Sequence, residues 1–99
     1  MARENVVRER SFEFAAAAIR LRRELNAQRE FDLSRQMVRA ATSVGANIVE
    51  ALAGHSRRDF AARMTIASKE AREALYWLRL IRQAELVPEA SVNPMIAAA

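Results

Sequence analysis

The stretch that decides the fold is Phe60–Ile81, FAARMTIASKEAREALYWLRLI. Its apolar residues recur at alternating spacings of four and three, which is a heptad seam. The seam consists of Phe60, Met64, Ala67, Ala71, Ala74, Leu78 and Ile81. Seams of this kind pack one helix against another at a small crossing angle. Trp77 and Leu80 lie off the seam, so the helix is apolar on a second side and needs a second neighbour. We predict a bundle helix over residues 56–85, with Ser56 as its N-cap.

Two further apolar series at helical spacing precede this seam. The first predicts a helix over about residues 11–28, with Ser11 in the N-cap position. The second predicts a helix over about residues 32–53 that ends at a glycine, Gly54. Gly45 lies inside the second helix, where glycine costs roughly 1 kcal/mol relative to alanine. We expect a close helix crossing at this glycine in compensation.

The two ends of the chain carry weaker signals. Residues 1–10 have too little apolar content for a core element, and we predict a flexible arm there. Asn93 before Pro94 is the order expected at a helix start, so a short or truncated fourth helix is expected over about residues 93–99. With 21 alanines and two glycines among 99 residues, the sequence predicts one all-α domain, an antiparallel up-and-down four-helix bundle with three full helices.

The basic residues are unevenly distributed. The net charge is +4, and fifteen of the sixteen basic residues are arginines. The surplus falls on the first and third predicted helices. If these helices are neighbours, they bring together five candidate nucleic-acid-binding residues, Arg20, Arg23, Arg72, Arg79 and Arg82. Such a patch binds phosphates with an affinity that falls as salt rises. The alternative is that +4 only keeps a small domain soluble.

Two other features bear on recognition. The aromatic residues Phe12, Phe14, Phe31, Phe60, Tyr76 and Trp77 are mostly in core register, so the sequence shows no aromatic signature for RNA binding. A polar stripe borders the apolar face of the second helix and consists of Arg39, Ser43, Asn47 and Glu50. It is interpreted either as a flank that hydrogen-bonds to neighbouring helices or as an interface for a ligand or another subunit.

The sequence contains few of the residues that a catalytic or metal-binding site needs. The chain has no cysteine, and its one histidine, His55, falls in a predicted loop. Helix bundles that hold metals use Glu-x-x-His, which is absent, and we interpret Glu70 and Glu73 as ion-pair partners of Arg63 and Lys69. We therefore expect no catalytic residue, no metal, no cofactor and no small-molecule substrate.

No secretory signal and no apolar run long enough to span a membrane are present, so we expect a cytoplasmic protein without a membrane partner.

Several short segments are weak signals individually, but their combined spacing is specific enough to indicate a family. These are Arg39–Ala41, Ser43, Ala46–Ile48, Glu50, Ser56, Asp59–Phe60, Ile66–Ala67, Glu70–Ala71, Glu73 and Tyr76–Leu78. Together they resemble the bacterial four-helix-bundle proteins called 23S rRNA intervening-sequence proteins, and the likeness covers residues 11 to about 87. The resemblance implies a non-enzymatic bundle of poorly defined role that assembles as a homopentameric ring, with a relative acting as an accessory protein to RNA and reverse transcriptase.

This sequence departs from that pattern at its C-terminus, where a full fourth helix is expected. Three helices leave an apolar groove, so either the chain is a truncated product or a partner subunit covers the groove. The leading hypothesis is a homo-oligomeric, RNA-binding or nucleic-acid-binding accessory protein. The alternative is a protein–protein interaction or scaffold module that binds no nucleic acid.

Overall fold

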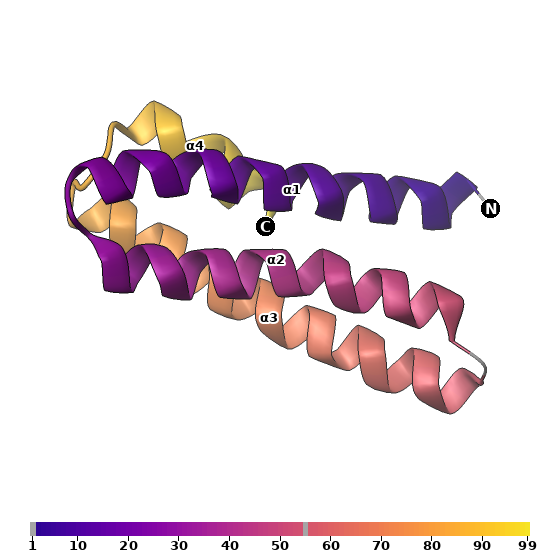
Figure 1. Ribbon diagram of the computed structural model, residues 1–99. Helices are drawn as coiled ribbons and strands as arrows, with labels where there is room; N and C mark the ends of the chain where they lie inside the picture. Colours follow the sequence, from indigo (N-terminus) through magenta and orange to yellow (C-terminus); the bar gives the residue numbers. More distant parts are fainter. Residues whose placement is uncertain (1, 55) are drawn as a thin grey trace.

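The computed structural model describes residues 2–54 and 56–99, which form four helices and no strand. The three long helices are α1 (Ala2–Ala27), α2 (Phe31–Ala53) and α3 (Arg57–Gln83), and α4 (Glu89–Ala98) is short. Figure 1 shows the long helices running up and down beside one another, with α4 near the end that holds the α1–α2 turn. The predicted all-α bundle with three full helices and a short fourth is confirmed. His55 lies outside the described residues.

The core follows from the order in which the helices pack. α2 lies along both α1 and α3, while α4 contacts α3 and α1 from the other side. Each long helix contributes fully buried seam residues to one cluster, among them Leu21, Leu25, Met37, Leu78 and Ile81. α4 adds Val92 and Met95. The predicted α3 seam therefore faces inward from Ala67 to Ile81, whereas Phe60 at its beginning is exposed.

The first helix begins earlier than the sequence predicts. α1 extends back to Ala2, through the segment expected to be a flexible arm. Ser11 is an interior residue whose hydroxyl donates a hydrogen bond to the Arg8 carbonyl (2.9 Å). Arginine and glutamate are strong helix formers, and Arg8 also donates to the Asn5 side chain at i−3 (2.7 Å). The helix therefore continues beyond the core that it packs against.

Two interhelical turns at the same end of the bundle have the same geometry. After α1, Arg29 has φ 64°, the Glu30 amide donates to the Leu25 carbonyl and the Arg29 amide to the Asn26 carbonyl. After α3, Glu85 has φ 56°, the Leu86 amide donates to the Ile81 carbonyl and the Glu85 amide to the Arg82 carbonyl. Both are Schellman motifs, which usually place glycine at this position. The Gln28 side chain donates to the Leu86 carbonyl and links the two turns.

The α2–α3 connection uses both residues that the sequence singled out. Ser56 is the N-cap of α3 as predicted, and its hydroxyl accepts a hydrogen bond from the Asp59 amide (3.0 Å). Gly54 ends α2, but with φ −64° and extended backbone, so the left-handed conformation expected there is absent. A Cβ atom at Gly54 would lie 3.1 Å from the Ala51 carbonyl oxygen, a tight contact with backbone, and it would also displace the Asp59 carboxylate.

The fourth helix also begins earlier than predicted. α4 begins at Glu89 after Pro88, so Asn93 and Pro94 lie inside the helix and do not open it. Val92 and Met95 are buried at i, i+3, which shows that the packing face begins before Asn93. α4 covers only part of the bundle, and beside its C-terminal end lies an apolar hollow of about 580 Å³ bordered by Phe14, Ile48 and Met95, among others.

Gly45 lies at a close contact between α1 and α2. It is buried opposite Ser11, and a Cβ atom at Gly45 would lie 3.3 Å from both the carbonyl and the hydroxyl oxygen of Ser11. The backbones therefore approach more closely at this point than larger residues allow. The close crossing expected from the sequence is confirmed.

One arginine joins α2 to α3. Arg39 donates to Glu70 (3.1 Å) and to Glu73, and Glu70 is among the few charged residues that are buried. Arg63 lies instead near Asp59 (3.9 Å). The predicted pairs of Glu70 with Arg63 and Glu73 with Lys69 are therefore wrong, because both carboxylates turn toward α2 instead of pairing along α3.

A larger residue at Gly45 is expected to destabilise the bundle. Gly45→Leu forces α1 and α2 apart at Ser11 and lowers the free energy of unfolding by about 2 kcal/mol in urea titrations. Ala46→Leu, on the exposed side of the same helix turn, is the matched control and changes it by less than about 0.5 kcal/mol. Equal effects of the two substitutions would contradict the close crossing.

Loss of the Arg39 guanidinium is expected to leave Glu70 buried without its partner. Arg39→Met lowers the free energy of unfolding by about 1.5 kcal/mol. This is less than the loss for a fully buried ion pair, because water screens the half-exposed Arg39 side chain. Arg35→Met, which removes only the exposed pair with Asp32, costs less than about 0.5 kcal/mol. In a Glu70→Gln/Glu73→Gln background, Arg39→Met is expected to lower the free energy of unfolding by only as much as Arg35→Met does in the unmodified protein. If Arg39→Met lowered it as much in that background as in the unmodified protein, the ion pairs would contribute nothing to stability.

Candidate nucleic-acid interface

The five arginines predicted to form one cluster lie in two places. Among the described residues the backbones of α1 and α3 are not in contact, since α2 and α4 lie between them. Arg20 and Arg23 belong to α1, whereas Arg72, Arg79 and Arg82 belong to α3. The condition on which the single cluster rested, that the first and third helices are neighbours, is not met.

The three candidate binding arginines on α3 differ in their surroundings. Arg82 is partly buried and donates to the Asn93 side chain of α4 (3.2 Å), so it holds α4 to α3. Arg72 is exposed and donates to the Ser68 hydroxyl one turn earlier (2.9 Å). Arg79 is exposed. Arg72 and Arg79 are therefore the two that present their guanidinium groups to solvent.

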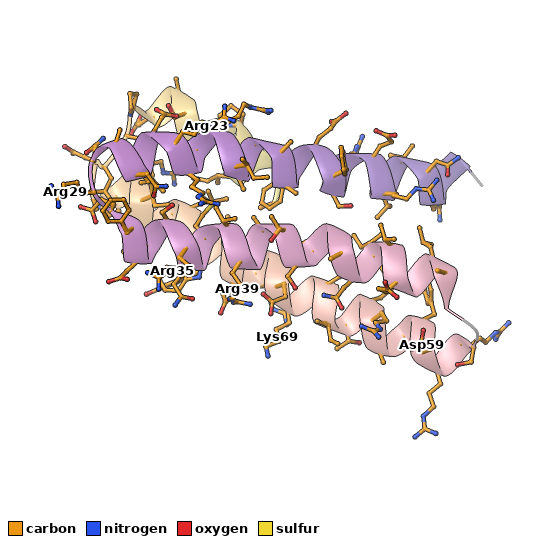
Figure 2. All side chains as sticks on the ribbon, in the orientation of Figure 1. Arg23, Arg29, Arg35, Arg39, Asp59 and Lys69 are labelled. Atoms are coloured by element: carbon orange, nitrogen blue, oxygen red, sulfur yellow. The ribbon has the colours of Figure 1, made fainter. Side chains whose placement is uncertain are left out.

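Lys69, Arg72, Tyr76 and Arg79 form what we call the α3 outer face. Their spacings of three, four and three place them on one side of the helix, opposite the buried seam. All four are exposed, and Tyr76 is 59% exposed. Figure 2 shows Lys69 pointing away from the other helices. Lys69 and Tyr76 were not among the binding residues predicted from the sequence. Tyr76 is four residues from Arg72 and three from Arg79, and this spacing would have placed it on the same helix face.

Glu73 borders this face, four residues after Lys69 and three before Tyr76, but its carboxylate pairs with Arg39. α3 has seven basic and three acidic residues, a net charge of +4. Glu70 and Glu73 pair with Arg39 of α2, and Asp59 lies near Arg63 at the beginning of the helix. The α3 outer face therefore carries three cations and no anion.

The prediction that the aromatic residues are mostly in the core is wrong. Phe14 is buried, but Phe12 (73%), Phe31 (50%), Phe60 and Tyr76 are exposed. Trp77 is the anchor beside Tyr76: it packs against the core, and the two rings meet edge to face with centroids 5.2 Å apart. Tyr76 is thus held at the surface beside a neighbour that packs against the core.

The polar stripe on α2 is partly used within the molecule. Arg39 crosses to α3, as described above. The Asn47 amide donates to the carbonyl and hydroxyl oxygens of Ser43 (2.9 and 3.1 Å), so these two residues bond to each other along α2. Glu50 is exposed at the end of the stripe. The stripe offers fewer unengaged groups to a ligand than the α3 outer face.

The described part of the structure limits the other kinds of site that it can hold. In the part of the chain that the structure describes, no three His, Cys, Asp or Glu side chains come together in a way that could hold a metal ion. None of the helices, over the same residues, combines the length and the apolar character that crossing a membrane requires.

Comparison with solved structures gives a close likeness over most of the chain. A protein of unknown function from the S23 ribosomal protein family of Bacteroides thetaiotaomicron VPI-5482 is 40% identical, with a TM-score of 0.88. The likeness covers 93% of this chain and 86% of that one. No curated protein matches this chain.

The family comparison covers nearly the whole sequence. The family described as 23S rRNA-intervening sequence protein matches residues 3–99, from the beginning of α1 through α4. The resemblance seen in the sequence alone began at residue 11, and the match now includes the part of α1 that precedes Ser11. The chain belongs to the 23S rRNA-intervening sequence protein family.

Proposed function

We propose that this protein is a non-enzymatic RNA-binding accessory protein that contacts structured RNA in the cytoplasm through the α3 outer face. The observation that carries the proposal is the separation of charge on α3. Its carboxylates lie near or pair with arginines, while Lys69, Arg72 and Arg79 surround an exposed tyrosine on the side opposite the buried seam. The family's name, which refers to 23S rRNA, and the ribosomal family of the solved relative support RNA as the ligand class.

The chemistry of the α3 outer face suits RNA. Guanidinium groups donate in a fork that matches phosphate oxygens, and the ammonium group of Lys69 adds a third positive charge. A helix surface bearing such cations contacts the backbone of a folded RNA without reading its sequence. Tyr76, between Arg72 and Arg79, offers a ring on which an unpaired base or a ribose packs. Binding through these groups must weaken as salt rises.

We propose further that the protein is a homo-oligomer, and a pentamer by family resemblance. Support comes from large apolar side chains that a single copy exposes on different helices, such as Phe12 and Ile19 on α1 and Ile66 and Leu80 on α3. Association of copies also multiplies the α3 outer face, so several weak phosphate contacts act together on one RNA.

Removing two guanidinium groups from the α3 outer face is expected to weaken RNA binding. Arg72→Gln/Arg79→Gln lowers the affinity for a 23S rRNA hairpin about ten-fold and reduces the slope of log K against log salt by about 2, measured by fluorescence anisotropy. The matched control, Arg20→Gln/Arg23→Gln on α1, removes the same charge from another place. The proposal fails if the α3 variant binds like the unmodified protein, or if the α1 variant loses as much.

The mass in solution tests the assembly. We expect light scattering to give about five times the 11.1 kDa of one chain. Ile66→Glu/Leu80→Glu places charge on the exposed apolar residues of α3 and is expected to reduce the mass, whereas Arg72→Gln/Arg79→Gln leaves it unchanged. A monomer at all concentrations would contradict the homo-oligomer.

Those exposed apolar side chains also favour the second candidate function, a protein-interaction module whose partner is another protein. Recovery of a protein partner from a nuclease-treated lysate, together with no binding of RNA by the purified protein, would decide for it.

A further inference from the structure

A second concave surface lies between α1 and α2, on residues that form no part of the α3 outer face. It is a hollow of about 440 Å³. Arg22 and Asn26 border it from α1, and Phe31, Ser34, Arg35 and Val38 border it from α2. We call it the α1–α2 groove. Its volume lies at the lower end of the range of small-molecule pockets.

Phe31 forms an aromatic wall of this groove. It is the first residue of α2, directly after the turn that Arg29 closes in the left-handed conformation, and it is 50% exposed. Val38, seven residues later, lies on the same side of α2 and is partly buried against the core. The groove thus offers a flat apolar surface that the helix packing does not use.

The cations of the groove are available to a ligand. The ion pairs of the described residues engage Arg35, Arg39 and Arg63, so Arg22 has none among them. Arg35 pairs only with Asp32 (2.9 Å), whose side chain is 98% exposed, and a contact so fully in water is readily exchanged. Arg39, which also borders the groove, is committed to Glu70 and Glu73.

Two uncharged polar groups complete the lining. Ser34 is 2% exposed and lies on the floor, and Asn26 is partly buried on the α1 side. The hydrogen bonds that the described residues make include none from either side chain to another protein group. A hydroxyl and an amide supply both donors and acceptors, which is what the edge of a nucleobase requires.

From this combination we propose that the α1–α2 groove holds one unpaired nucleotide of an RNA strand. The base stacks on Phe31 with its edge toward Asn26 and Ser34, and the adjoining phosphate lies between Arg22 and Arg35. A phosphate alone would leave the aromatic wall unused, whereas a nucleotide satisfies both the ring and the cations. The proposal rests on the proposed function for its ligand class, RNA, but uses different residues.

The experiment measures the affinity of the full chain for a single-stranded hexaadenylate RNA and for an abasic strand of the same length, by fluorescence anisotropy. Phe31→Ala is expected to weaken hexaadenylate binding about ten-fold and to leave the abasic strand within two-fold, because only the stacked base is lost. Phe31→Trp restores or strengthens binding. Arg22→Gln/Arg35→Gln weakens both strands. Phe60→Ala, which removes another exposed phenylalanine from outside the groove, is the control and changes neither.

Unchanged hexaadenylate binding by Phe31→Ala, with the helix content of the variant intact, would overturn the proposal. So would an altered mass of that variant in solution together with equal losses on both strands, which would make the groove a contact between copies. Binding of free AMP as tight as that of the hexamer would also overturn RNA as the source of the nucleotide. The two proposals fail separately, because hairpin binding depends on Arg72 and Arg79 and hexaadenylate binding on Phe31.

Discussion

The contact of Arg39 with Glu70 and Glu73 is the constraint on which the rest of the structure depends. It joins the middle of α2 to α3 through one guanidinium and two carboxylates, one of them buried. Because the two glutamates are three residues apart on α3, one guanidinium can engage both in the same rotation of α3 that buries its apolar seam. That rotation turns Ala67, Ala74 and Leu78 into the core and leaves Lys69, Arg72, Tyr76 and Arg79 on the opposite side. One interaction thus contributes to stability and separates the charges that we propose to act on RNA.

A second constraint operates between α1 and α2. Gly45 allows the backbone of α2 to approach Ser11, and the glycine-free turn through Arg29 returns the chain so that Phe31 begins α2 beside the end of α1. The close approach and the tight turn together bring Arg22 and Asn26 opposite Arg35 and Val38. The α1–α2 groove is therefore a consequence of how the first two helices pack. Of its lining residues, Ser34 is buried, Val38 packs against the core and Arg39 joins α2 to α3.

The features that could be predicted from the sequence were those that depend on the spacing of residues close together in the chain. The seam from Phe60 to Ile81, the capping by Ser56 and the crossing at Gly45 each follow from residues near in the chain, and all three appear in the structure. Glu70 was assigned the wrong partner because Arg63 is seven residues away in sequence, whereas Arg39 is 31 residues away and is brought close only by folding.

The ends of helices were predicted less well for a related reason. The segment before Ser11 has too few apolar residues for a core element but is rich in arginine and glutamate, which are strong helix formers, so α1 extends through it on intrinsic propensity. The turns at Arg29 and Glu85 carry no glycine, and thus no signal of the left-handed conformation. The two candidate interfaces were predicted only in part. Arg72 and Arg79 of the α3 outer face were selected for their charge. Tyr76 and Phe31 were assigned to the core, because helical periodicity alone does not tell how much of each helix face is covered by other helices.

The central claim, that RNA meets this protein on the α3 outer face, is tested most directly by mapping the amide and side-chain chemical shifts of the isotopically labelled protein during titration with a 23S rRNA hairpin. The account predicts that the largest changes fall on Lys69, Arg72, Tyr76 and Arg79, while Glu70, Glu73 and the Arg39 side chain change little. Changes centred on Arg39, Ser43 and Asn47, with none on the α3 outer face, would contradict it.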